Sequence, residues 1–195
     1  MSDLQYPIGK FQWVGSATDE DRRRAIAAIA AAPAQLCAAV TGLSPKQLDT
    51  PYRPEGWTVR QLVHHVPESH MNAYIRFKLA LTEEQPTIKP YREDLWAKLA
   101  DVKPTPIEAS LALLESLHQR WVIVLRSMSA ADFARTLNHP EAGVLTLDRT
   151  LALYAWHGAH HAAHVTSLRD RMGWKKTARK AASKRKKSHG KRKKR

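Results

Sequence analysis

Long stretches in which apolar residues recur every three or four positions, separated by proline-rich loops, most constrain the fold of this chain. The clearest stretch carries Leu111, Leu114, Leu117, Trp121 and Leu125, which a helix places on one buried face. No segment shows the sustained alternation of apolar and polar residues that is typical of a half-buried strand. The sequence therefore predicts an all-α fold, an antiparallel four-helix bundle with loop insertions.

Capping residues, prolines and glycines predict where the four helices begin and end. The first follows Thr18, an N-cap residue, and reaches Val40, with a kink or break expected at Pro33. Capping boxes predict that the second covers residues 58–81 and that the third follows Thr105. The last helix is expected over residues 148–172, and residues 138–146 before it form a loop or a short hairpin.

The positive charge is concentrated at one end of the chain. The net charge is +14, yet residues 175–195 hold thirteen of the 32 Lys and Arg residues and no acidic residue. Residues 1–174 keep 19 basic and 18 acidic residues, a net charge of +1. A segment of like charges with no apolar periodicity cannot form a core. We therefore expect a metal-binding helical bundle over residues 1–174 and a disordered basic tail over residues 175–195.

The cellular setting follows from what residues 1–195 contain. One cysteine, Cys37, rules out an intramolecular disulfide, and the first residues carry no apolar run of signal-peptide length. We find no stretch of about 18 apolar residues such as a membrane-spanning helix needs. The sequence predicts a cytoplasmic protein with no membrane span.

Histidines are unusually dense in the last helix. His157 and His161 lie one helical turn apart, as do His160 and His164. His161 falls on the inward stripe, His157 borders it, and the missing side chain of Gly158 is expected to leave room for an ion. We therefore predict that His157 and His161 bind a metal ion together, with His160 nearer to solvent.

A third ligand has to come from another helix, and His64 and His65 on the second helix are both candidates. His164 could face the site or the substrate. A histidine cluster could also be a packing element sensitive to pH, since imidazoles titrate near pH 6.5. A non-enzymatic bundle is therefore an open alternative.

A family resemblance bears on this choice. The segment Trp57-Thr58-Val59-Arg60-Gln61-Leu62-Val63-His64-His65 resembles the tryptophan–helix–histidine motif of the DinB/YfiT superfamily. The similarity continues through residues 49–91, 153–164 and 171–174, and it covers essentially residues 4–174. The basic tail is not part of the family pattern.

The resemblance implies a four-helix bundle that holds one divalent ion, nickel or zinc, through three histidines with one open position. The family's ligands fall on His65, His157 and His161. Relatives are called metal-dependent hydrolases, and the wider superfamily includes metal-dependent S-transferases that use thiols such as bacillithiol, mycothiol or glutathione. Homodimers are common in the family, so a homodimer is expected here as well.

The leading hypothesis is a metal-dependent enzyme that acts on a small-molecule substrate. Its ion activates either a thiol cofactor, as in a bacillithiol-dependent S-transferase, or water, as in a hydrolase. Five residues are candidates for supporting or substrate-facing roles: His164, Glu68, Asn72, Tyr74 and Arg76.

The alternative is a nucleic-acid-associated protein in which the histidine bundle is not catalytic. Lysines and arginines of the tail would contact phosphates, or another anionic surface, without reading sequence. The candidate residues are Lys184, Arg185, Lys186, Lys187, Lys191, Arg192, Lys193, Lys194 and Arg195.

Overall fold

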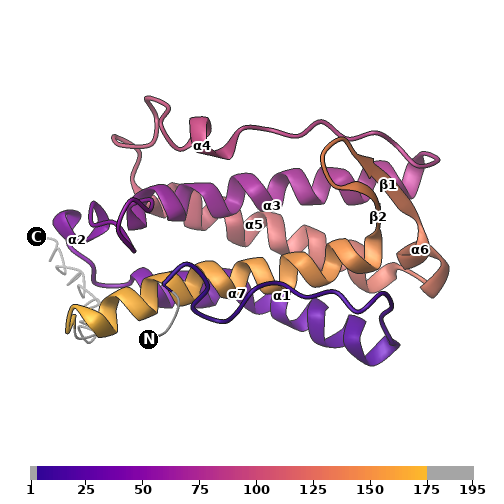
Figure 1. Ribbon diagram of the computed structural model, residues 1–195, viewed down its shortest axis with the longest axis horizontal. Coiled ribbons are helices and arrows are strands. Elements are labelled where there is room, and N and C mark those ends of the chain that lie inside the picture. The colour runs from indigo at the N-terminus through magenta and orange to yellow at the C-terminus, as the bar shows by residue number, and fades with distance from the viewer. Residues whose placement is uncertain (1–3, 175–195) are drawn as a thin grey trace, which may run out of the picture.

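The computed structural model describes residues 4–174, and four long helices dominate this part of the chain (Figure 1). They are α1 (Asp19–Val40), α3 (Val59–Thr82), α5 (Ile107–Ser127) and α7 (Leu147–Arg171). The predicted all-α four-helix bundle is confirmed. The connections contain three short helices and a two-stranded antiparallel hairpin: α2 (Pro45–Leu48), α4 (Glu93–Trp96), α6 (Ala130–Ala134), β1 (Thr136–His139) and β2 (Gly143–Thr146).

Side-chain caps begin most of the long helices. Thr58 forms the predicted capping box of α3. Thr18 is the predicted N-cap residue of α1 and also forms a capping box with Asp21, and Thr146 caps α7. The capping box predicted at Thr105 is wrong. Helix α5 begins one residue later, so Pro106 occupies the N-cap position without a side-chain bond. The N–H of Thr105 instead donates to the carbonyl of Asp101.

Helix α1 continues through Pro33, so the predicted break there does not occur. A proline has no N–H, and the carbonyl four residues earlier, that of Ile29, therefore lacks its helical donor. In this fold His118 of α5 supplies a donor, with its Nδ1 atom 2.6 Å from the Ile29 oxygen. A neighbouring helix thus satisfies the carbonyl that Pro33 leaves without an intrahelical partner.

The contacts refine the directions of the helices. Helices α1 and α7 run parallel, because Arg22 pairs with Asp148 where both begin and Arg169 donates to the Ala39 carbonyl where both end. Helices α3 and α5 are also parallel, and the two pairs run antiparallel to each other. A parallel neighbour requires a crossover as long as the bundle, and residues 83–106 with α4 provide it, as Figure 1 shows.

Helix α1 is, among the described helices, the one long and apolar enough by length and composition to cross a membrane. Its place in the bundle accounts for that composition. Ile29, Ala32 and Leu36 are buried on the face that packs against α5 and α7. The apolar stripe of α1 is thus part of the core of the bundle.

Candidate metal centre

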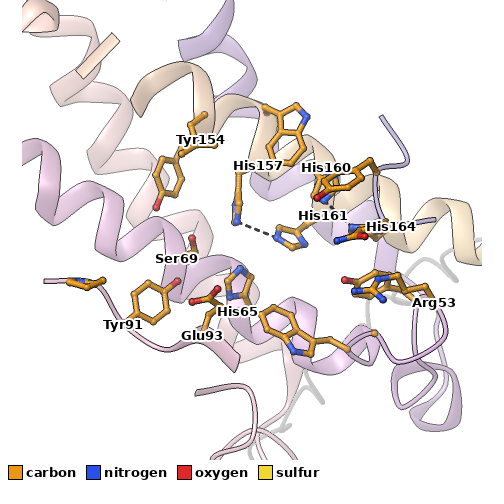
Figure 2. A pocket seen from close by; sticks show the side chains of 18 of the residues that line it. Arg53, His65, Ser69, Tyr91, Glu93, Tyr154, His157, His160, His161 and His164 are labelled. Atoms are coloured by element: carbon orange, nitrogen blue, oxygen red, sulfur yellow. Dashed lines mark hydrogen bonds between the residues drawn. The ribbon is translucent and has the colours of Figure 1, made fainter. Parts of the chain in front are cut away.

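Three histidines from two helices converge beside a cavity. His65 comes from α3, and His157 and His161 lie one turn apart on α7; one nitrogen of each lies within 4.8 Å of the others. The Nε2 atoms of His157 and His161 are 3.2 Å apart, the contact drawn as a dashed line in Figure 2. Two nitrogens that bind one tetrahedral zinc ion at its usual bond length lie about 3.3 Å apart. The spacing therefore fits a shared divalent ion.

His64, the other candidate for the third ligand, points elsewhere. Its Nδ1 atom lies 2.7 Å from the Ser110 hydroxyl of α5, and His64 does not line the cavity that His65 lines. Successive residues on a helix point about 100 degrees apart. The fold therefore brings His65, and not His64, to the pair on α7.

The protonation state of the three imidazoles also suits a metal. Burial lowers the pKa of His65 from 6.5 to about 4. Burial, and then the neighbouring histidines, hold the pKa values of His157 and His161 well below 6.5. The Nδ1 atoms of His65 and His161 are buried and have no hydrogen-bond partner within residues 4–174. Neutral, sparsely bonded imidazoles are the form that binds divalent ions, so the residues present fit the implied group.

His160 is buried, so its predicted position toward solvent is wrong. Its ring stacks on Trp156 with ring centroids 4.2 Å apart, and Tyr6 of the N-terminal segment lies 6.0 Å away. Figure 1 shows this segment running along α7. The spacing of residues along one helix does not indicate whether a segment from elsewhere in the chain covers that helix. His160 is thereby enclosed at the cavity beside the three histidines.

His164 lines the cavity next to His160. The Nε2 atoms of the two rings are 2.9 Å apart, and the His164 ring lies 4.0 Å from that of Tyr52. Burial first, then His160 and Arg53, lower the pKa of His164 to about 3. His164 is therefore a neutral group placed to contact a bound molecule.

The prediction that Gly158 leaves room for an ion is wrong. A Cβ atom at this position would lie 2.9 Å from the Cβ of Ala32 and 3.5 Å from Cε1 of His70. The space beside Gly158 is thus filled by α1. The glycine allows α1 and α7 to approach closely.

The remaining predicted residues divide into two groups. Arg76 lines the cavity, whereas Glu68, Asn72 and Tyr74 do not. Burial and Asp101 raise the pKa of Glu68, and Asn72 donates to the Glu68 carbonyl. Tyr74 packs against the core and carries the Lys78 ammonium over its ring. These three side chains therefore lie on faces of α3 that do not line the cavity.

The cavity has a volume of about 590 Å³ and is walled partly by connections between helices. Tyr91 and Glu93 enter it from the crossover, and Ser69 and Tyr154 from α3 and α7. Figure 2 shows the hydroxyl ends of both tyrosines turned toward Ser69. Burial raises the pKa of Tyr91 to about 12 and also raises that of Tyr154, so both phenols keep their protons. These groups were not predicted from the sequence, although Tyr154 lies one turn before His157 on the same helix and could have been placed beside it from the spacing alone.

Two further histidines, also missed, continue the site into the core. Nδ1 of His157 lies 3.0 Å from Nε2 of His70, and Nδ1 of His70 lies 2.8 Å from Nε2 of His118. Nδ1 of His118 contacts the Ile29 carbonyl. We call His161, His157, His70 and His118 the histidine row. The row could have been suspected from the sequence, because His118 lies between Leu114 and Trp121 within the apolar stripe of α5.

The predicted nucleic-acid contacts of the tail, from Lys184 to Arg195, lie outside the described residues. The predicted boundary between a helical bundle at residues 1–174 and a basic tail at residues 175–195 is not tested, because the tail lies outside the described residues.

Comparisons with known proteins agree with this architecture. A family model described as the DinB superfamily matches residues 28–165. Proteins of Bacillus mycoides (strain KBAB4) and Bacillus cereus (strain 03BB102), each named "Putative metal-dependent hydrolase", are 56% identical over 174 residues, which is 89% of this chain and all of theirs. The structure of YfiT from Bacillus subtilis superposes with a TM-score of 0.86 at 48% identity, covering 88% of this chain and 99% of that one. Its description is "a probable metal-dependent hydrolase with an unusual four-helix bundle topology". The family match and these relatives, together with the bundle and its three histidines, show that the chain belongs to the DinB superfamily.

Proposed function

We propose that this protein is a metal-dependent hydrolase of small molecules, with His65, His157 and His161 as the metal ligands. The observation that carries the proposal is the convergence of three neutral imidazole nitrogens at the wall of an open polar cavity. A divalent ion held by three histidines with one open position supplies a water nucleophile at neutral pH and polarises a substrate oxygen. The names of the Bacillus relatives support the same reaction class.

The chain's own residues would serve the reaction around that centre. Tyr91 and Tyr154 remain protonated, so their hydroxyls can donate hydrogen bonds to an oxygen that gains negative charge. Glu93 lies close enough to raise the pKa of both phenols, and it lines the same cavity as His65. We assign to its carboxylate the role of accepting a proton from the attacking water.

The size and lining of the cavity define the substrate class. A volume of about 590 Å³ falls within the range of small-molecule sites. Two guanidinium groups, those of Arg53 and Arg76, line it together with the two phenols. The proposed substrate is a small polar molecule with a hydrolysable carbonyl group.

The first test is elemental analysis of protein purified without a histidine tag. We expect about one equivalent of zinc, nickel or a similar ion in the wild type and its loss in His161→Ala. The matched control is His64→Ala, which removes a buried histidine bonded to Ser110 outside the cavity and should keep the metal. A wild-type protein that stays metal-free after addition of zinc or nickel would contradict the proposal.

A second test separates hydrolysis from thiol transfer. The metal-loaded protein is incubated with a panel of esters and amides, and with an electrophile such as monobromobimane, with and without bacillithiol. Turnover of an ester or amide without thiol, lost on chelation, supports hydrolysis. Metal-dependent conjugation that requires the thiol, with no turnover in its absence, would replace hydrolysis by S-transfer at the same three histidines.

A further inference from the structure

The histidine row ends at a group that can only accept hydrogen bonds. Its last contact is between Nδ1 of His118 and the Ile29 carbonyl, at 2.6 Å. Pro33 leaves this carbonyl without its intrahelical donor, so the oxygen is available to His118. The proton of this hydrogen bond must therefore lie on Nδ1 of His118.

The proton on Nδ1 of His118 determines which ring nitrogen carries the proton in His70 and in His157. A neutral imidazole carries one N–H, so protonated Nδ1 leaves Nε2 of His118 as an acceptor. Nε2 of His118 lies 2.8 Å from Nδ1 of His70, which must donate. Nε2 of His70 is then an acceptor, and it lies 3.0 Å from Nδ1 of His157, which must donate in turn. At the end of the row, Nε2 of His157 has no proton.

We propose that the Ile29 carbonyl, through His118 and His70, sets the tautomer of His157 so that its Nε2 lone pair is directed at the metal site before any ion binds. His118 and His70 are thus positioning residues, which act on the ion through His157. The inference rests on the proposed metal site. It adds to that site two residues from the core and a role for the proline in α1.

Burial keeps the imidazoles of the row neutral, so each ring carries a single N–H. His70 and His118 are fully buried, and desolvation lowers the pKa values of both. The ring planes of His70 and His118 are 19° apart and their centroids 4.9 Å apart, as expected for two rings joined edge to edge by the 2.8 Å contact. The rings therefore have little room to rotate, and an alternative set of tautomers would place two N–H groups or two lone pairs against each other.

The most direct test needs no variant. Nitrogen-15 spectra of the metal-free wild type, recorded through the two-bond couplings of the imidazole rings, report which ring nitrogen of each histidine carries a proton. We expect a proton on Nδ1 and none on Nε2 for His118, His70 and His157. A proton on Nε2 of His157 in the metal-free protein would overturn the proposal, whatever the metal content of the purified protein.

The second test breaks the row at its far end. In His118→Leu the Nδ1 proton of His70 loses its acceptor, so His70 can donate from Nε2 instead and move the proton of His157 to its Nε2 atom. Changes to groups that hydrogen-bond to metal ligands typically weaken binding about 10–100-fold, and we expect a loss of that size for zinc in competition with a chelator. The conservative variant His118→Gln has a side-chain amide that can accept from His70 and donate to the Ile29 carbonyl, so it should bind zinc within about threefold of the wild type.

Leu114→Ala is the matched control for packing, because Leu114 lies one turn from His118 on the same helix, is fully buried and takes no part in the row. It should lose stability without losing zinc affinity. Unchanged zinc affinity in folded His118→Leu would overturn the inference while leaving the metal site intact. If His118→Leu fails to fold, the wild-type spectrum and His118→Gln decide the question. A wild type that binds no zinc refutes the proposed function, and the spectrum of the metal-free protein still tests the tautomers.

Discussion

At the scale of single residues, the cavity brings together histidines that stay neutral and tyrosines that keep their hydroxyl protons. Burial lowers the pKa values of His65, His157 and His161, so their nitrogens offer lone pairs at neutral pH. The same physical effect raises the pKa values of Tyr91 and Tyr154, so their hydroxyls remain donors. Burial thus keeps the proposed metal ligands and the hydrogen-bond donors side by side in their uncharged forms.

The role of Tyr91 can be tested by removing only its hydroxyl. We expect Tyr91→Phe to lower kcat about 100–1000-fold, because a donor to the developing negative charge is lost. Metal content should stay at one equivalent, because Tyr91 is not a ligand. Steady-state kinetics and elemental analysis check both points. Tyr74→Phe is the control, since Tyr74 lies outside the cavity; an equal loss in both variants would contradict the role of Tyr91.

At the scale of elements, the parallel pair α1 and α7 is joined at both ends by arginines. Arg22 of α1 forms two hydrogen bonds of 2.8 and 2.7 Å with the Asp148 carboxylate where α7 begins. Arg169 of α7 donates to the carbonyls of Ala39 and Thr41 where α1 ends. Between these ends Gly158 lets the helices approach closely. Helix α1 is thereby held against the helix that carries two of the proposed ligands.

This close approach predicts the effect of a single methyl group. Gly158→Ala should destabilise the protein by about 1–3 kcal/mol. The added Cβ would lie 2.9 Å from the Cβ of Ala32, and this clash can be relieved only by moving the backbone of α1 or α7. Urea unfolding measures the change. The double variant Ala32→Gly with Gly158→Ala removes the clash and should recover most of the loss. Alanine has a higher helix propensity than glycine, and that effect alone would make Gly158→Ala neutral or stabilising. Such a result would contradict the close approach of α1 and α7 at Gly158.

The sequence predicts helices and faces well, but it says little about what covers those faces. Capping residues located the starts of α1 and α3, and i, i+4 spacing selected His157 and His161. Helix periodicity carries no information on direction, so the parallel arrangement of α1 and α7 was not predicted. Other missed features depend on segments distant in the chain: the burial of His160 under the N-terminal segment, and the hydrogen bonds of His118 to α1 and α3.

At the scale of the whole molecule, the bundle encloses imidazoles that stay uncharged when it is folded. In the unfolded chain these histidines titrate near pH 6.5, whereas in the folded, metal-free protein they titrate lower, His65 and His160 at pKa values of about 4. Below pH 6.5 the unfolded state therefore binds more protons than the folded state. Stability must fall as the solution is acidified from neutrality toward pH 4.

The pH dependence should be large enough to measure. The shift at His65 alone corresponds to about 3 kcal/mol once the pH is below both pKa values. We expect the free energy of unfolding of the metal-free protein, measured in urea at pH 7, 6 and 5, to decrease at each step. His65→Gln should flatten this dependence. A free energy of unfolding that stays constant from pH 7 to pH 5 would show that the cluster is already charged or exposed.

The cavity is built by two kinds of structure. Its proposed ligands lie within long helices, whereas Tyr52, Arg53, Tyr91 and Tyr6 come from connections and from the N-terminal segment. Substitutions in those connections can therefore reshape the wall of the cavity and leave the proposed ligands in place. The proposed ion ligands and much of the cavity wall thus belong to different parts of the fold, so changes in the connections can alter which molecules enter while the three histidines stay fixed.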